Sequence, residues 1–425
     1  MLYLGILFFV MVFLGIPVAV GLGLTGVVGI WITQDIPLEV VAARTGSATD
    51  NIILLAIPLF VLTGSLMTAG GIAQRLFDLA RVLVGHFTGG LAQVNVVLSV
   101  FNGGLSGSSA ADAAMDCKVT IPQMRKDGYP AAFSGAITAV SGMLSNILPP
   151  AIALLVYASL TNTSVGRLFV AAIIPGIILA VAMSATAFWI SRRKGYGRPR
   201  PRASMGEIWT AFRRSGLALV IPAIVVFGIR FGVFTATEAG AAAVVITFIL
   251  GAFVYKELKL RDLPGVLART AVDTGVIMLI IALSAPVAWV LAYNQVPQHL
   301  AEFFAGMSDD VLFFLLAVNI FLILGGALME GVSLLILVAP ILAAVAAGLG
   351  VDPVHFGIVV VVNVVLGAIT PPFGQLVFFV SSMTDIRPEQ MFRQIAAFLP
   401  MLVLVLALVT YAPDLYLWTV DLFGP

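Results

Sequence analysis

Long uninterrupted apolar stretches limit what this chain can fold into. Met1–Ile32, Leu168–Ile190, Thr235–Val254 and Arg393–Val409 are each long enough to cross about 30 Å of hydrocarbon as a helix. Hydrophobic residues make up 60% of the 425 residues and charged residues only 10%, whereas a soluble domain is about 25% charged. The apolar runs are continuous rather than alternating, which argues against a β-barrel. The sequence therefore predicts an all-α polytopic membrane protein.

Other compositional features narrow the possible functions. Cys117 is the single cysteine, so an intrachain disulfide and a cysteine metal cluster are excluded. The net charge of +1 gives no indication of a nucleic-acid partner. The stretch 1–33 lacks a basic start, and its apolar run is too long for a signal peptide. We expect it to be embedded in the lipid bilayer.

The basic residues predict how the chain threads the membrane. The densest cluster runs from Arg192 to Arg214 and is expected on the cytoplasmic side. Counting crossings outward from it, residues 88–122 leave and return on that same side. They are therefore expected to form a re-entrant hairpin with its tip at Gly103–Ser109. Residues 309–350 form a second such hairpin, entered from the opposite side.

The same order of elements in opposite orientations is typical of an inverted repeat. Pro149-Pro150 matches Pro371-Pro372, and the hairpins match in a slightly different register, where Asp112 pairs with Glu330. We expect a first repeat over residues 1–214 and a second over residues 215–425. In the first repeat, the elements expected after the scaffold helices are a hairpin at about 88–122, a broken helix at 131–160, a helix at 168–190 and a basic linker at 191–214. In the second repeat, they are a hairpin at about 309–350, a broken helix at 355–383 and a C-terminal helix at 393–418.

The beginning of the chain leaves one question open. The second half has three crossings before its hairpin, whereas the first half shows two, within Met1–Trp31 and Ile52–Ala69. Either the first segment is more complex than one crossing or the N-terminus lies outside. The segments Gln74–Val84 and Pro37–Arg44 are amphipathic and are expected to lie along the membrane interface.

Two double prolines interrupt spanning segments, in Ser145–Pro150 and Gly367–Pro372. Each pair removes two backbone donors, and its rings clash with the preceding turn, so the helix must open. The freed carbonyls cannot face lipid and need protein or a polar guest. If only one such site were present, a packing kink would explain it. Two repeat-related sites, each with a glycine- and serine-rich hairpin tip nearby, favour a binding role.

Bare carbonyls and half-helix C-termini suit a monovalent cation, while half-helix N-termini suit an anionic substrate group. The hydroxyls of Ser106, Ser108, Ser109, Ser145 and Thr370 offer additional neutral oxygens, which fit Na⁺ better than a divalent ion. We therefore expect coupling-ion sites where each hairpin tip faces its broken helix.

A catalytic interpretation is also possible, because Gly104-Leu105-Ser106-Gly107 matches the nucleophile motif of rhomboid intramembrane proteases. A serine nucleophile needs a base within hydrogen-bond reach. The three histidines, His86, His299 and His355, are expected near the membrane faces. We therefore expect no enzymatic activity.

Two acids lie inside apolar segments, where ionisable groups are costly. Asp112 and Glu330 are either functional or local caps at the start of a hairpin helix, and both alternatives stay open. Glu238, three residues after Thr235, is expected to form a capping box.

Several motifs occur in order along nearly the whole chain: "SGSSAADAA", "VTIPQM", "GYPAAFSGAITA", "ILPPAIALLVYA", "FTATEAGAAAV" and "GAITPPFGQLVF". They resemble the large membrane subunit of the tripartite ATP-independent periplasmic (TRAP) transporters. The resemblance implies an Na⁺-coupled symporter of organic acids in the bacterial inner membrane, working by an elevator mechanism. It also implies a small four-helix membrane subunit and a periplasmic substrate-binding protein as partners.

Carried over by position, the resemblance implies two Na⁺ sites with an acid held between the hairpin tips. The implied Na⁺ ligands are Ser106, Gly107, Ser108, Ser145, Pro149, Gly325, Gly367 and Thr370. The implied substrate contacts are Gly104, Ser109, Asp112, Glu330, Pro150 and Pro372. The substrate itself stays open among dicarboxylates, sialic acids, sugar acids and keto acids.

One alternative is an Na⁺/dicarboxylate symporter of inverted-repeat type that acts without a binding protein. Another is a channel, which would need a continuous polar pore. The polar residues instead gather at two tips, which favours a transporter.

Overall fold

The computed structural model describes residues 2–32, 37–197, 201–307 and 311–422. All regular secondary structure in this part of the chain is helical, which confirms the predicted all-α polytopic class. Seven of its helices are long and apolar enough to cross a membrane, or eight if one bent pair is counted as a span. Arg198 and Arg200 of the basic cluster, and Asp309 and Asp310 at the start of the second expected hairpin, lie outside the described residues.

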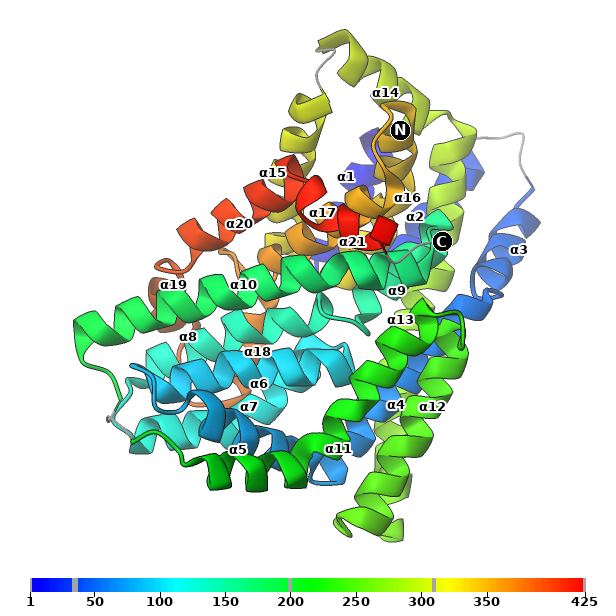
Figure 1. Ribbon diagram of the computed structural model, residues 1–425. Coiled ribbons are helices and arrows are strands. Elements are labelled where there is room, and N and C mark those ends of the chain that lie inside the picture. The colour runs from blue at the N-terminus through cyan, green and yellow to red at the C-terminus, as the bar shows by residue number, and fades with distance from the viewer. Residues whose placement is uncertain (1, 33–36, 198–200, 308–310, 423–425) are drawn as a thin grey trace.

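The helices fall into two groups (Figure 1). The scaffold group takes the first part of each half of the chain, and in it α2 packs on α13 and α12 on α4. Its members are α1 Leu2–Phe13, α2 Val18–Ile32, α3 Glu39–Ala48, η1 Ile52–Leu55, α4 Ala56–Ala69, α5 Ile72–Val84, α11 Met205–Arg230, α12 Ala236–Ile249, η3 Leu250–Val254, η4 Leu260–Asp262, α13 Leu263–Tyr293 and α14 Val296–Met307.

The hairpin group takes the second part of each half. Hairpin 1 consists of α6 and α7, and hairpin 2 of α15 and α16; each is followed by a helix that is broken in the middle. The members are α6 Gly90–Ser106, α7 Ser109–Lys126, α8 Ala131–Gly142, η2 Met143–Asn146, α9 Ile152–Thr161, α10 Val165–Lys194, α15 Val311–Leu328, α16 Gly331–Gly348, α17 Pro353–Gly367, α18 Gln375–Met383, α19 Pro388–Ile395, α20 Leu399–Tyr411 and α21 Asp414–Leu422.

The two halves of the chain can be aligned with each other so that Pro149-Pro150 matches Pro371-Pro372. We call this alignment the proline register, and it holds for the hairpins as well as for the broken helices. In this register the first residues of α7 and α16 coincide, and so do those of α8 and α17. Contacts between helices are exchanged in the same way, since α9 packs on α16 while α18 packs on α7. The separate register expected for the hairpins is therefore wrong, and Ser108, not Asp112, is the counterpart of Glu330.

The N-terminal segment contains two helices rather than one crossing. α1 ends at Phe13 and α2 begins at Val18, after Gly15 with φ +85° and Pro17. Glycine tolerates this left-handed conformation, and proline pre-sets the first helical turn. The first segment is therefore the more complex one, and α1, α2 and α4 match α11, α12 and α13 in number.

Two further expectations were wrong in detail. The basic linker is short, because Arg213 and Arg214 already belong to α11 and residues 191–194 still belong to α10. The expected C-terminal helix is three helices, with a bend of 59° between α19 and α20. Pro400 lies in the first turn of α20, and Pro413 stands two residues after the end of this helix, where proline cannot continue it.

The amphipathic helix α5 packs its apolar face against other helices of the protein. Its apolar side chains Leu76, Phe77 and Ala80 are fully buried, and the helix packs on α6 and α11. By contrast, α3 has no buried residue, packs on α13 and places Arg44 over the ring of Trp289. Only α3 therefore keeps the interfacial character expected of both.

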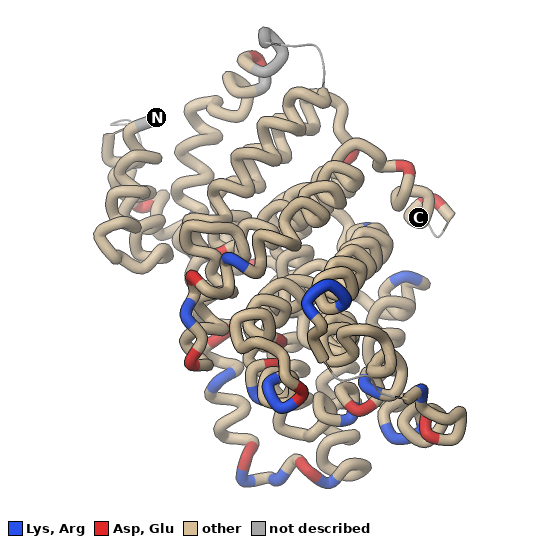
Figure 2. The backbone as a smooth tube through the Cα atoms, turned by 90° about the vertical axis from the view of Figure 1, so that its left-hand side faces the viewer, with Lys and Arg blue, Asp and Glu red and all other residues tan. Residues whose placement is uncertain are grey.

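The charged residues are unevenly placed. Lys and Arg gather in the lower half of the view in Figure 2. Hairpin 1 ends in Arg125 and Lys126, whereas hairpin 2 ends at Gly348 and is followed by Asp352. Basic residues mark the cytoplasmic side, so this difference supports opposite orientations of the two hairpins.

Candidate functional site

The tip of hairpin 1 is a tight turn between α6 and α7. Gly107 ends α6 with φ +60°, a left-handed conformation that favours glycine. Ser108 then caps α7, and its hydroxyl accepts a hydrogen bond from the N–H of Ala111 at 3.4 Å. The Ser106 hydroxyl accepts from the N–H of Ser108 at 3.4 Å. The tip therefore presents several neutral oxygens at a helix N-terminus.

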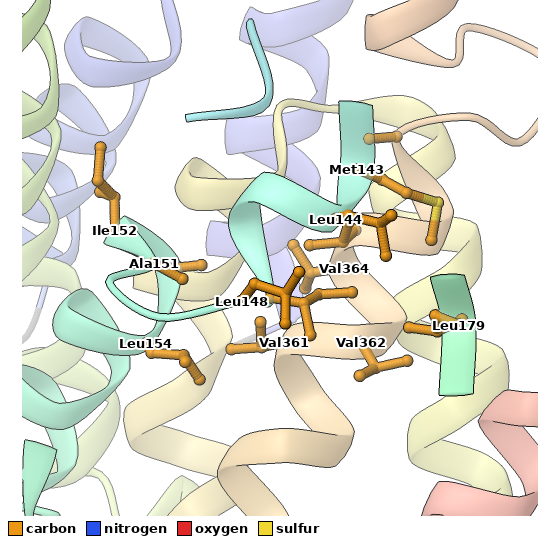
Figure 3. Packing of buried hydrophobic residues seen from close by; sticks show 14 of the residues in the cluster. Met143, Leu144, Leu148, Ala151, Ile152, Leu154, Leu179, Val361, Val362 and Val364 are labelled. Carbon is orange, nitrogen blue, oxygen red and sulfur yellow. The ribbon is translucent and has the colours of Figure 1, made fainter. Parts of the chain in front are cut away.

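The break in the first broken helix, break 1, covers residues 147–151, between η2 and α9. The Pro149-Pro150 peptide bond is cis, as is Pro371-Pro372 in the other half. Figure 3 shows Leu144 and Leu148 packed beside Val361 and Val364 of α17. This side of break 1 is packed with aliphatic side chains.

The tip of hairpin 1 docks directly on break 1. The Gly107 carbonyl accepts a hydrogen bond from the N–H of Ile152 at 3.3 Å, and a Cβ at Gly107 would overlap the carbonyl oxygen of Pro150. The N–H of Ser109 donates to Oδ1 of Asn146 at 3.3 Å. Glycine is required here because the backbone of break 1 occupies the space of a side chain.

A buried polar layer lies below this tip. The Asn102 amide nitrogen donates to Asp112 Oδ1 at 2.7 Å, and the Ser145 hydroxyl donates to Asp112 Oδ2 at 3.0 Å. All three residues are buried. Ser145 and Asp112, both singled out from the sequence, therefore contact each other. Asn102 was missed, although an asparagine inside an apolar run was a usable signal.

Hairpin 2 meets break 2, residues 368–374, through glycines. A Cβ at Gly367 would lie 2.5 Å from the Cα of Gly326, and the N–H of Phe373 donates to the carbonyl of Ala327 at 3.3 Å. Gly325 instead faces Leu334 in the second arm of its own hairpin. The close backbone contact therefore belongs to Gly326, and the role of Gly325 as an Na⁺ ligand stays a prediction.

Two polar residues of the second half are used locally. Glu330 caps α16, and its carboxylate accepts from the N–H groups of Val332 at 3.0 Å and Ser333 at 2.7 Å. The Thr370 hydroxyl donates to the carbonyl of Leu366 at 2.8 Å, which leaves its oxygen lone pairs available. For Glu330 the structure therefore shows capping, one of the two roles left open. Thr235 and Glu238 form the expected capping box.

Side-chain bonds also tie the first arm of each hairpin to the broken helix that follows. Asn95 donates to Thr138 Oγ1 at 2.9 Å and accepts from the Ser141 hydroxyl at 2.5 Å. In the second half, Asn363 donates to Asn319 Oδ1 at 2.7 Å. Ser141 and Asn363 occupy equivalent positions in the proline register. Each hairpin is therefore attached to its own broken helix well away from the tip.

The implied substrate contacts fall into two clusters. Gly104, Ser109, Asp112 and Pro150 surround the tip of hairpin 1, whereas Glu330 and Pro372 belong to hairpin 2 and break 2. Between the described residues no hydrogen bond joins the two clusters. Gly104 also touches the scaffold, because a Cβ there would lie 3.0 Å from Cβ of Pro222 in α11. An acid between the tips stays a prediction.

The geometry gives no support to a serine nucleophile. No hydrogen bond between described residues joins Ser106 to a histidine. His355 is committed elsewhere, with its Nδ1 2.6 Å from the hydroxyl of Tyr416.

The donor set at hairpin 1 fits a cation held by oxygen. Asn102 Oδ1 and Ser109 Oγ are buried and have no hydrogen-bond partner. Buried polar atoms are normally satisfied, so two orphaned oxygens beside one tip point to a guest. In the described part of the chain no three His, Cys, Asp or Glu side chains come together as a metal cluster. Neutral oxygens with at most one carboxylate fit Na⁺ best.

The two repeats differ at the outer ends of their hairpins. Arg125 at the end of α7 pairs with Asp385 at 2.6 Å, and this hydrogen-bonded ion pair holds the pKa of Asp385 below its usual value of 3.8. The equivalent residues in the other repeat are Ala347 and Thr163. They line a cavity of about 280 Å³ between α9, α16 and α17. One end is therefore fastened by charge and the other is open.

Residues 5–415 match the family described as the tripartite ATP-independent periplasmic transporter, DctM component. The chain belongs to the DctM family. This confirms the resemblance carried by the motifs around the two tips and the two breaks. The family and the apolar helices make the chain a multi-pass integral protein of the bacterial inner membrane, the large membrane component of a TRAP transporter.

Three relatives show the range of the DctM family. The chain is 36% identical over 413 residues to the sialic acid TRAP transporter large permease protein SiaM of Vibrio cholerae, covering 97% of this chain and 96% of that one. It is 38% identical to the C4-dicarboxylate TRAP transporter large permease protein DctM of Pseudomonas aeruginosa, covering 92% of each. It is 32% identical to the isethionate TRAP transporter permease protein DctMQ of Oleidesulfovibrio alaskensis, covering 94% of this chain but 63% of that protein.

A solved structure shares the fold of this DctM-family chain. The crystal structure of the Alcanivorax borkumensis YdaH transporter superposes with a TM-score of 0.55 at 14% identity, covering 88% of each chain. At this identity the likeness concerns the fold alone.

Proposed function

We propose that this DctM-family chain imports an organic acid by symport with Na⁺, and that a periplasmic binding protein delivers the acid. The observation that carries the proposal is the docking of two glycine-containing hairpin tips on two helix breaks. At hairpin 1 this docking leaves Asn102 Oδ1 and Ser109 Oγ buried without partners. The Na⁺ ligands expected there are oxygens of Ser106, Gly107, Ser108 and Pro149. At hairpin 2 they are the oxygens around Gly326, Gly367 and Thr370.

The names of the relatives support an organic acid as the substrate. Sialic acid and C4-dicarboxylates are carboxylates, and isethionate is a sulfonate. Half-helix N-termini suit an anionic group, and α7 and α16 begin at the two tips. An acid bound between these N-termini, beside the cations, is the arrangement that we propose.

The relative named DctMQ supports a small membrane subunit as a partner. This chain covers 63% of that protein, so about a third of it lies outside the DctM-like part. We infer that the additional part corresponds to a small four-helix subunit, and we propose such a subunit as a partner of the present chain. The scaffold group exposes large apolar side chains to receive it, among them Trp31, Val272 and Val276.

We also propose that the hairpin group slides against the scaffold group as an elevator. Small residues meet across the boundary at three places. A Cβ at Gly64 would lie 2.9 Å from Cβ of Ser106, one at Gly104 would meet Pro222, and one at Gly166 would lie 3.4 Å from Ile229. At these three glycines no side chain of the glycine projects across the boundary, which supports relative movement there. The side-chain bonds inside each hairpin unit support its movement as one body.

The test is uptake into proteoliposomes that contain the chain and its small membrane partner. Uptake is expected to require both an inward Na⁺ gradient and the soluble binding protein. Uptake at full rate with choline in place of Na⁺ would exclude the coupling. Uptake that needs Na⁺ but no binding protein would favour the alternative, an Na⁺/dicarboxylate symporter acting alone.

Single hydroxyl deletions test the proposed Na⁺ ligands. Ser106→Ala and Thr370→Ala are each expected to raise the Na⁺ concentration for half-maximal uptake by roughly tenfold, because each removes one oxygen from a site of few ligands. Ser382→Ala is the matched control, since that exposed hydroxyl only bonds its own helix. Unchanged Na⁺ dependence in both variants would remove the site assignment.

A further inference from the structure

Asp112 is a carboxylate buried inside hairpin 1 without a cationic partner. It is 2% exposed, and it accepts hydrogen bonds from Asn102 at 2.7 Å and from Ser145 at 3.0 Å. None of the ion pairs between described residues includes it. A carboxylate within an apolar segment is costly unless a positive charge or a proton compensates it. Two neutral donors leave this charge uncompensated.

A second carboxylate makes the imbalance larger. Asp116 lies one turn further along α7 and is fully buried. Its partners are again neutral, the hydroxyl of Thr120 at 3.1 Å and that of Ser99 at 3.5 Å. Lys118, two residues beyond Asp116 in sequence, is exposed. The interior of hairpin 1 therefore lacks positive charge of its own.

Two unpartnered oxygens lie beside Asp112. The amide nitrogen of Asn102 already donates to Asp112, so the free Oδ1 of the same amide group lies next to that carboxylate. Ser109 precedes Asp112 by three residues, and residues at this spacing share one helix face. The backbone N–H of Ser109 donates to Oδ1 of Asn146, and the carboxylate of Asp112 accepts from the Ser145 hydroxyl, so both residues contact η2. The hydroxyl of Ser109 is buried and has no partner.

We propose that these groups form a cation site of their own, one helical turn below the hairpin tip. Its ligands are the carboxylate of Asp112, Oδ1 of Asn102 and the hydroxyl oxygens of Ser109 and Ser145. The site takes Na⁺, and only this identity of the ion rests on the proposed function. Asp112 is then a cation ligand, in place of the substrate contact that the resemblance implied.

The other hairpin has no such site. In the proline register Asn102, Asp112 and Ser145 correspond to Leu324, Leu334 and Gly367. The cation in hairpin 1 is therefore additional to any pair of repeat-related ions. It also compensates a fixed negative charge, so its affinity depends on Asp112 more than on any neutral ligand.

The experiment is direct binding of ²²Na⁺ to the purified full-length chain with its small membrane partner, at constant ionic strength with choline chloride. Asp112→Asn keeps the shape of the side chain but removes its charge. It is expected to lose one bound Na⁺ per chain, or to raise the Kd of that ion by roughly tenfold or more. Asp116→Asn is the matched control and is expected to keep the number of bound ions.

The possible outcomes separate this inference from the proposed function. If the unaltered protein binds Na⁺ and Asp112→Asn binds the same number with the same Kd, the additional site does not exist. If the unaltered protein binds no Na⁺, the coupling itself is wrong. Should Asp112→Asn fail to fold, the Kd for Na⁺ is measured on Ser109→Ala instead. This variant deletes one ligand, leaves the helix cap at Ser108 intact and is expected to raise the Kd. An unchanged Kd in Ser109→Ala would then overturn the inference.

Discussion

Gly326 and Gly367 let two backbones meet where a side chain on either would prevent it. Both glycines lie in helices. A Cβ added to Gly367 would lie 2.5 Å from the Cα of Gly326, and one added to Gly326 would lie 3.0 Å from the Cα of Gly367, so either would overlap the other residue. Such a contact brings the carbonyls of break 2 close to the hairpin tip. Side-chain oxygens are few there, so backbone oxygens are the main ligands of the second Na⁺ site that we propose.

Gly367→Ala tests this contact. The added methyl group must push hairpin 2 away from break 2, and overpacking of this kind costs about 1–3 kcal/mol of unfolding free energy. We expect lower stability in SDS titration and a higher Na⁺ requirement for uptake. Gly348→Ala, in the same hairpin, has open space around its Cβ and should behave as the unaltered protein. Equal behaviour of the two variants would contradict the proposed close contact.

At the scale of elements, hairpin 1 is fastened at both of its ends. Its tip docks on break 1, its middle is bonded to α8 through Asn95, and its outer end is held by the Arg125–Asp385 ion pair. The ion pair also links hairpin 1 to the segment between α18 and α19, which belongs to the other repeat. It is therefore a connection between the halves rather than within one.

Asp385→Asn tests the strength of that connection. Because Arg125 lowers the folded-state pKa of Asp385 below 3.8, the stabilisation is present above that pH and is lost as the pH falls through the lowered value. The variant is expected to unfold at a lower temperature by a constant amount between about pH 5 and pH 8. Asp78→Asn, in the looser exposed pair with Arg81 at 4.0 Å, is the matched control. A difference that changes with pH in this range would contradict the assignment.

At the scale of the whole molecule, exchanged contacts make the two halves one body. Scaffold helix α2 packs on α13 of the other half, and α12 packs on α4. In the hairpin group α9 and α16 are joined, as are α18 and α7. Each half therefore buries apolar helix faces against the other.

Cysteine labelling tests the opposite orientation of the halves. Lys126 is the last residue of α7 and Gly348 is the last residue of α16, and the two positions are equivalent in the proline register. Both residues are exposed. In a Cys117→Ala background, Lys126→Cys should react with a membrane-impermeant maleimide from the cytoplasmic side and Gly348→Cys from the periplasmic side. Labelling of both from one side would rule out an inverted repeat.

Sequence reasoning recovered the class, the hairpins and the breaks, because long apolar runs, charge asymmetry and double prolines act locally. It missed what depends on rotation about a helix axis. Gly325 and Gly326 differ by about 100° in direction, and the sequence does not reveal which one faces break 2. Asn102 was overlooked because its partner lies on the other arm of the hairpin. The break between α1 and α2 was hidden by apolar residues on both of its sides.

The ion pair at one hairpin and the cavity at the equivalent place of the other have a practical consequence. Dissolved salt screens exposed charges, so raising ionic strength loosens the Arg125–Asp385 end and leaves the Ala347–Thr163 end unaffected. Any titration of this transporter with sodium chloride thus changes two variables at once. A response to sodium itself is recognised only when an inert electrolyte holds the total salt constant.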